Sequence, residues 1–207
     1  MGDLVVHMFV TLDGVMQAPG EPEEDIEGGF RHGGWQAPYY DEESGRLIAE
    51  HYGEMDALLL GRKTYEIFAP YWSQAPADNP FTKLLNEVPK YVASRSLDRV
   101  DWNNSTLLRG DVGDEVARLK GEYGQVHVAG SGDLLQTLFA RALVDRINLW
   151  VYPVVLGTGK RLFAEGATPA AHRLVESQAF PGGAVLLVYE RAGTPTYGNM
   201  ASDAQQF

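Results

Sequence analysis

The sequence of 207 residues contains no cysteine. A chain without thiols has no disulfides, no thiolate nucleophile and no zinc site built on cysteine sulfur. Its five histidines have no spacing typical of a metal site, such as His-x-x-x-His, so we expect no metal. No apolar run reaches the length of a membrane span, and no basic-then-apolar leader opens the chain. We therefore expect a cytoplasmic protein that does not contact a membrane.

Basic residues are also few, with 17 Lys and Arg against 28 Asp and Glu and a formal net charge of −11. This balance repels phosphate backbones, which disfavours nucleic acid as a partner. It leaves room for a small anionic ligand, because such a ligand needs only a local group of cations. The hydrophobic content of 44% is ordinary for a globular protein with a full core, and the length fits one domain or two small ones.

The order of apolar and periodic segments predicts an α/β fold. Residues 4–10 form a continuous apolar run, which is typical of a strand buried on both faces of a mainly parallel sheet. The remaining pattern predicts strands at 56–61, 90–94, 105–108, 125–129, 147–156, 172–179 and 184–190, and helices at 39–52, 61–69, 78–87, 112–123 and 133–142. Alternating strands and helices indicate a mixed, mainly parallel sheet with an antiparallel finish. We expect one domain over residues 1–190 and a tail over 191–207.

Three of these strands end in residues that suit phosphate groups. The segments are Gly61-Arg62-Lys63-Thr64, Ser94-Arg95 and Gly130-Ser131-Gly132-Asp133. The carboxyl ends of parallel strands meet at one edge of a sheet, where α/β proteins bind ligands. A glycine turn that leads into a helix also directs backbone N–H groups and the positive end of the helix dipole at one point. Each cation alone is typical of a solvated surface, but their common placement favours a dinucleotide.

The glycine turn at 130–132 differs from a standard Rossmann fingerprint. Leu135 stands where the third glycine would be, and the next strand does not end in the acidic residue that would bind a ribose hydroxyl. When arginines lie at this edge of the sheet and no such acidic residue is present, the site favours NADP(H) over NAD(H), because an arginine can bind the 2′-phosphate.

Residues 17–38 form a long segment rich in Gly, Pro and acidic residues between the first strand and the first helix. Long loops in compact domains are typically functional or disordered. We interpret residues 21–27 as solvated, whereas Phe30 and Trp35 would be costly to leave in water and are expected to be covered.

Four segments taken together resemble the dihydrofolate reductase-like superfamily: Asp13-Gly-Val-Met16, Leu60-Gly-Arg-Lys-Thr-Tyr-Glu66, Val128-Ala-Gly-Ser-Gly-Asp133 and Pro153-Val-Val-Leu-Gly-Thr-Gly-Lys-Arg-Leu-Phe163. The last two are most similar to the branch related to the reductase domain of riboflavin biosynthesis, the RibD C-terminal-like branch. The resemblance covers residues 4–190. It implies a three-layer α/β/α sandwich that binds NADPH and transfers hydride to a small heterocycle, pterin- or pyrimidine-like.

The resemblance also implies roles for individual residues. The adenosine phosphates would be held by Gly61, Arg62, Lys63 and Thr64, and the adenine ribose would lie beside Ser94 and Arg95. The pyrophosphate would be bound by Gly130, Ser131, Gly132, Asp133 and Leu134. The nicotinamide would lie between Val10 and Met16. In dihydrofolate reductase a carboxylate on the first helix supplies the proton. Asp41 and Glu43 are near the matching place, with Tyr40 as an alternative relay or stacking group, although acids at a helix start are also simply favoured there.

Two further expectations concern assembly and alternatives. Trp150, Tyr152 and the edge marked by Pro153 suggest an exposed apolar surface, which, with the resemblance, points to a homodimer. A nucleotide-binding or oligomerisation module of the same fold that has lost turnover stays open as a different class of function.

Overall fold

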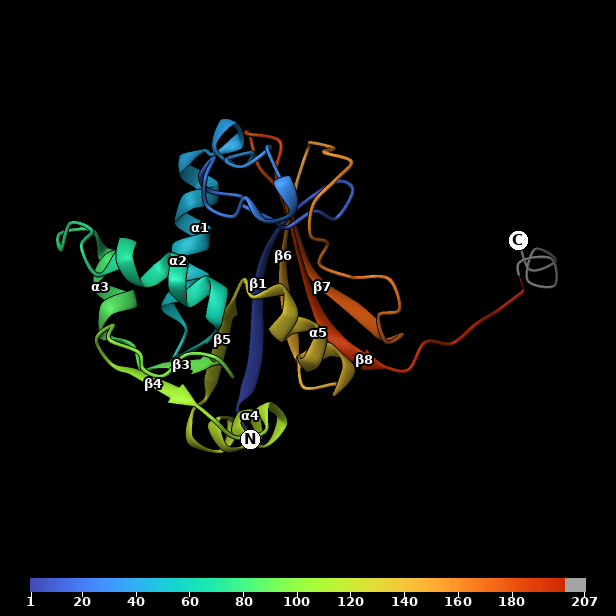
Figure 1. The fold of residues 1–207 in the computed structure, drawn as a ribbon. Coiled ribbons are helices and arrows are strands. Elements are labelled where there is room, and N and C mark those ends of the chain that lie inside the picture. The colour runs from blue at the N-terminus through green and yellow to red at the C-terminus, as the bar shows by residue number, and fades with distance from the viewer. Residues whose placement is uncertain (200–207) are drawn as a thin grey trace.

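A computed structural model describes residues 1–199 of the chain, and its centre is an eight-stranded sheet of order β4-β3-β2-β5-β1-β6-β8-β7 (Figure 1). Strands β1 to β6 pair in parallel, and β8 runs antiparallel to both β6 and β7. The bounds are β1 Asp3–Thr11, β2 Ala57–Gly61, β3 Lys90–Ala93, β4 Ser105–Leu108, β5 Gln125–Ala129, β6 Arg146–Tyr152, β7 Ala171–Ala179 and β8 Val185–Gly193. The mainly parallel sheet with an antiparallel finish confirms the fold predicted from the sequence.

Five α-helices cover the two faces of this sheet: α1 Glu42–Gly53, α2 Arg62–Trp72, α3 Pro80–Glu87, α4 Val112–Glu122 and α5 Gly132–Ala140. Two 3-10 turns, η1 Glu27–Gly29 and η2 Ala37–Tyr39, precede α1. Successive side chains of a strand point to opposite faces. In β2, Leu59 therefore packs with α4 and α5, whereas Leu58 and Leu60 pack with α1, α2 and α3. This gives the three layers.

Residues 17–38 pack over the β6 and β8 side of the sheet. Phe30 and Trp35 are both only 6% exposed, as expected for large apolar side chains. The indole N–H of Trp35 donates to the carbonyl of Gln17 at 2.8 Å. The ring of Trp35 also meets that of Tyr152 edge to face at 5.5 Å.

The expected apolar edge at Trp150 and Tyr152 is wrong. Trp150 is fully buried and Tyr152 is 2% exposed, because Trp35 and Phe180 cover them. The strand itself stops at Tyr152, one residue before Pro153, which cannot donate a ladder hydrogen bond.

Two other element boundaries differ from the prediction. The helix expected to end before Pro70 continues through it as α2 to Trp72, where Trp72 packs edge to face on Phe81 of α3 at 5.2 Å. The packing of that last turn outweighs the lost backbone hydrogen bond at the proline. Strand β8 extends to Gly193, three residues beyond the expected domain boundary. No helix within residues 1–199 is long and apolar enough to cross a bilayer.

Candidate active site

The three phosphate-suited segments follow β2, β3 and β5, and these strands are neighbours in the order β3-β2-β5. Their carboxyl ends therefore lie along one edge of the sheet, as the sequence predicted. Helix α2 begins directly after β2, and α5 begins three residues after β5 ends.

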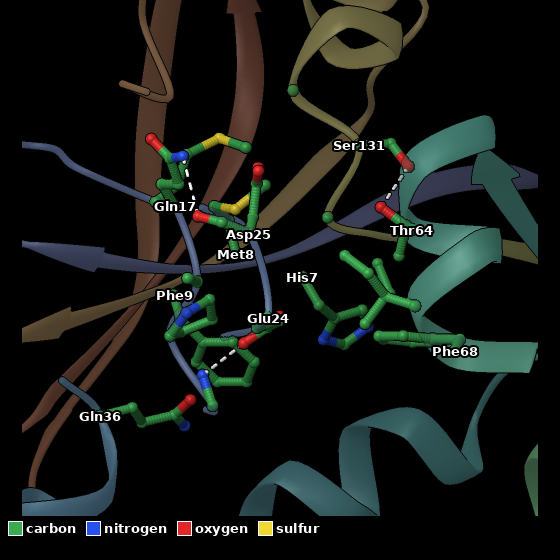
Figure 2. Close-up of a pocket in the computed structure, with 18 of the residues that line it drawn as sticks. His7, Met8, Phe9, Gln17, Glu24, Asp25, Gln36, Thr64, Phe68 and Ser131 are labelled. Atoms are coloured by element: carbon green, nitrogen blue, oxygen red, sulfur yellow. Dashed lines mark hydrogen bonds between the residues drawn. The ribbon is translucent and has the colours of Figure 1, made fainter. Parts of the chain in front are cut away.

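The turns after β2 and β5 are bound to each other through Ser131. Its hydroxyl accepts a hydrogen bond from the N–H of Gly61 at 2.7 Å and donates one to the hydroxyl of Thr64 at 2.7 Å (Figure 2). Close approach requires glycine here, since a Cβ at Gly61 would lie 2.9 Å from Cβ of Ser131. Gly130 and Ser131 both have positive φ, 65° and 67°, which turns the chain sharply into α5.

The N-termini of α2 and α5 both lack a capping side chain for their backbone N–H groups. Asp41, Asn79 and Asp111 cap α1, α3 and α4 with side-chain hydrogen bonds. No side chain within residues 1–199 caps α2 or α5 in this way. The N–H groups of their first turns are therefore available to a ligand, and the helix dipoles favour an anion.

A cavity of about 910 Å³ opens beside these two turns (Figure 2). Its walls combine the glycine turn with strand β1, the 17–38 segment and the facing sides of α1 and α2. Of the residues predicted from the sequence, it is lined by Met16, Tyr40, Lys63, Thr64, Gly130, Ser131, Gly132 and Asp133. The volume lies within the range of sites that hold small molecules or cofactors.

Six predicted cofactor residues lie outside this cavity's lining, and one of them is Gly61, whose N–H donates to the hydroxyl of Ser131. Val10 and Leu134 are buried in the main core, at 4% and 8% exposed. Arg62 points outward and pairs with Glu66 of its own helix at 3.0 Å. Ser94 and Arg95 instead line a second hollow of about 220 Å³. That hollow also contains Arg109 and lies where β3 and β4 end and α4 begins.

The proposed helix carboxylates are not brought to the cavity. Asp41 caps α1 by accepting from the N–H of Ser44 at 2.8 Å, and its other oxygen accepts from the N–H of Gly182 at 3.0 Å. Glu43 accepts from the amide of Gln178 on β7 at 2.8 Å. The hydrogen bond from the Ser44 N–H lowers the pKa of Asp41, which is the wrong direction for a proton donor. Both positions serve the helix start and its contact with the β7–β8 hairpin.

Acids of the 17–38 segment, which the sequence suggested to be solvated, lie in or beside the cavity wall. Asp25 and Glu27 form an ion-pair cluster with two lysines that we call the clamp. Lys160 lies 2.6 Å from Asp25 and 2.5 Å from Glu27, and Lys63 lies 2.7 Å from Glu27. Hydrogen bonds from these two lysines hold the pKa of Glu27 at about 2.

A buried chain of polar side chains borders the cavity on the sheet side. His7 of β1, which lines the cavity, lies with its Nε2 3.0 Å from Nδ1 of His127 on β5. Nε2 of His127 in turn lies 3.0 Å from the side-chain oxygen of Gln125. Because that oxygen only accepts, His127 carries its proton on Nε2 and His7 donates to it. Burial lowers the pKa of both histidines, that of His127 to about 4, so both are neutral at pH 7.

Sequence reasoning did not identify the individual side chains that wall the cavity opposite the glycine turn. They are largely aromatic or apolar and include Met8, Phe9, Ile48, Tyr52, Ile67, Phe68 and Phe81. Apolar side chains at helix and strand positions are expected to be core, and no sequence pattern marks those that border a cavity. The one available signal was His7, a polar residue within an otherwise apolar strand.

The sequence profile of the RibD C-terminal domain family matches residues 3–186. The chain belongs to this family. Among curated proteins it is similar to YyaP of Bacillus subtilis strain 168, a protein of uncharacterised function, with 28% identity over 194 residues that cover 92% of this chain and 95% of YyaP.

Two solved structures show the same fold as this RibD C-terminal domain. One is provisionally named a riboflavin biosynthesis protein, from Shewanella sp. PV-4, with a TM-score of 0.66, 18% identity and coverage of 91% of this chain and 98% of that one. The other is dihydrofolate reductase from Enterococcus faecalis, complexed with NADP(H) and RAB-propyl, with a TM-score of 0.58, 14% identity and coverage of 92% and 97%. The fold is thus that of the dihydrofolate reductase-like proteins.

Proposed function

We propose that this RibD C-terminal domain protein is an NADPH-dependent reductase that transfers hydride to a small heterocycle, pterin- or pyrimidine-like. The observation that carries the proposal is the pair of uncapped helix starts joined by Ser131 at the head of the cavity. Supporting it, the Enterococcus faecalis reductase of the same fold is complexed with NADP(H).

The residues at the sheet edge fit the parts of this coenzyme. The N–H groups from Gly132 to Leu134 would bind the pyrophosphate, where missing side-chain caps leave donors for an anion. Thr64 and Lys63 border the same end of the cavity. The second hollow, with Arg95 and Arg109, would take the adenosine end, because planar guanidinium groups suit a ribose phosphate.

The other end of the cavity suits a planar ring. Phe9, Tyr52 and Phe68 are among the aromatic side chains that line it, and flat apolar walls stack on heterocycles and exclude water. Bound NADPH supplies the hydride; the protein must align the donor and acceptor carbons and keep the site dry. Met16, next to Gly132 at the glycine turn, would flank the nicotinamide.

Two measurements test the proposal. Tryptophan fluorescence quenching reports NADPH binding, and loss of absorbance at the reduced nicotinamide band reports oxidation against 7,8-dihydrofolate, a dihydropterin and a 5-aminopyrimidinone riboside. The proposal predicts saturable binding and oxidation with at least one acceptor. Tight NADPH binding without oxidation would instead identify a non-catalytic nucleotide-binding module. Absence of NADPH binding would rule out both the reductase and the nucleotide-binding module.

A further inference from the structure

Three carboxylates line the cavity, Glu24, Asp25 and Asp133, and they differ in their partners. Asp25 is held by Lys160 in the clamp. Asp133 is exposed in the first turn of α5. Glu24 forms no ion pair within residues 1–199. One of its oxygens, Oε2, accepts from the N–H of Gly20 at 2.7 Å and of Glu21 at 3.2 Å.

The second oxygen of Glu24, Oε1, has no hydrogen-bond partner among the described residues. The two backbone N–H groups fix the carboxyl plane while leaving this oxygen for a ligand. Figure 2 draws Glu24 near the centre of the labelled side chains, with the Ser131–Thr64 pair on one side and Gln36 on the other. A carboxyl group therefore lines the same cavity as the residues proposed for the coenzyme.

Burial raises the pKa of Glu24, and repulsion from Glu21 and Asp25 acts in the same direction against the two backbone hydrogen bonds. Glu24 differs in this from Asp13, Asp25, Glu27, Asp41 and Asp111, whose pKa values are all lowered. A carboxyl group that retains its proton closer to neutral pH is suited to give it up during a reaction.

The cations that face the cavity do not counteract the raised pKa of Glu24, because each of them is paired with another carboxylate. Lys63 of α2 and Lys160 of the segment after β6 are engaged by Asp25 and Glu27. Arg161 pairs with Asp13 at 3.5 Å. The remaining titratable groups of the lining are His7 of β1, Tyr40 before α1, Tyr52 of α1 and Asp133 of α5.

We propose that Glu24, carried on the segment between β1 and α1, is the proton donor of the reduction. The inference rests on the proposed function and assigns the role that Asp41 and Glu43 cannot fill. The clamp contributes to this role, since the ion pairs of Asp25 and Glu27 tie the segment to Lys63 of α2 and to Lys160 after β6 and so help to position Glu24 in the cavity.

Reduction of a C=N bond adds a hydride to carbon and a proton to nitrogen, and the π electron pair becomes the new N–H bond. The hydride comes from the reduced nicotinamide, which becomes oxidised. The proton leaves Oε1 of Glu24, and the resulting carboxylate takes a proton from water before the next turnover.

The test compares Glu24→Gln, which keeps the shape but has no acidic proton, with Glu24→Asp, which keeps the acid. Glu23→Gln is the matched control, because Glu23 is exposed, adjacent and outside the cavity lining. We expect Glu24→Gln to lower the rate of NADPH oxidation about 10²- to 10⁴-fold. NADPH affinity should stay unchanged, the Asp variant should recover part of the rate, and the fall of rate with rising pH should disappear in the Gln variant.

A second readout does not depend on turnover. Carbon-13 NMR of the glutamate carboxyls should show one group titrating above the ordinary range, and that signal should be missing in Glu24→Gln. The proposal is overturned if Glu24 titrates normally, or if the Gln variant keeps the wild-type rate and pH profile. Absence of oxidation by the wild type with every acceptor overturns the proposed function itself, and normal NADPH affinity would then locate the failure in the chemistry.

Discussion

The hydroxyl of Ser131 donates to the hydroxyl of Thr64 at 2.7 Å, and this contact joins two turns that are 67 residues apart in sequence. The same oxygen accepts the N–H of Gly61. One serine thus fixes the relative position of two helix N-termini, and the proposed coenzyme site depends on that position.

Replacing Ser131 with Ala should separate the two turns and leave the N–H of Gly61 unpaired. We expect the free energy of unfolding to fall by about 1–3 kcal/mol, the cost of an unsatisfied buried donor. NADPH binding should weaken about tenfold, equivalent to ~1.4 kcal/mol. Thr64→Ser, which keeps the hydroxyl, is the control, and denaturation and fluorescence titration are the measurements. Unchanged coenzyme affinity in Ser131→Ala would contradict this role.

Arg95 and Arg109, which line the second hollow, should discriminate between the two nicotinamide coenzymes. If they meet the 2′-phosphate, the double replacement by Ala weakens NADPH far more than NADH, since each charge-assisted contact is worth ~1.5–3 kcal/mol. Arg46→Ala with Arg118→Ala removes the same charge from α1 and α4 and serves as the control. Equal weakening of both coenzymes by the test variant would remove the argument for NADP(H).

The clamp should compete with the coenzyme for Lys63 and Lys160. Asp25→Asn with Glu27→Gln frees both lysines, so NADPH should bind about two- to fivefold more tightly, the small effect expected when solvent-screened ion pairs are removed. Glu21→Gln with Glu23→Gln is the control, because it removes the same amount of charge from the same segment but breaks no ion pair with a lysine. Weaker binding in the test variant, measured by fluorescence at low salt, would show that the carboxylates orient the lysines for the coenzyme instead.

Asp13 fixes the turn after β1 and is expected to make stability depend on acid pH. Its carboxylate accepts from the hydroxyl of Thr11 at 2.6 Å and from the N–H of Gly157 at 2.9 Å, and the Thr11 hydrogen bond is the main cause that lowers its pKa from 3.8 to about 2. A carboxyl group whose pKa is lower in the folded state than in the unfolded state stabilises the fold at pH values above its unfolded-state pKa. This stabilisation is lost as the pH falls through the folded-state pKa. Asp13→Asn should therefore lower the free energy of unfolding at pH 7 and have a much smaller effect at pH 2, where the wild-type carboxylate is itself largely protonated in the unfolded state and partly protonated in the folded state. Urea unfolding at both pH values measures this, and an equal cost at the two would contradict it.

The sequence predicted the sheet edge well because its signals are local. A buried strand ending in Gly61 or Gly130 and followed by a helix needs no distant information, and parallel strands then bring their ends to the same edge. The pairing of Ser131 with Thr64 followed from no pattern, although both residues were assigned to the site.

The predictions from sequence were wrong where packing between distant parts of the chain determines the position of a side chain. Asp41 is a helix cap whose second oxygen binds Gly182, a contact from another part of the chain. Trp150 and Tyr152 are covered by Trp35 and Phe180, which the strand's own residues do not reveal. Glu24 belongs to an acidic segment with the composition of a solvated loop, and only the tertiary position of that segment makes it part of the cavity.

The decisive measurement is a crystal structure of the protein with bound NADPH. We expect the pyrophosphate against the N–H groups that follow Ser131, the adenosine near Arg95, and the nicotinamide in the cavity beside Met16. A coenzyme bound elsewhere, or saturating NADPH with no density along this edge of the sheet, would contradict this expectation.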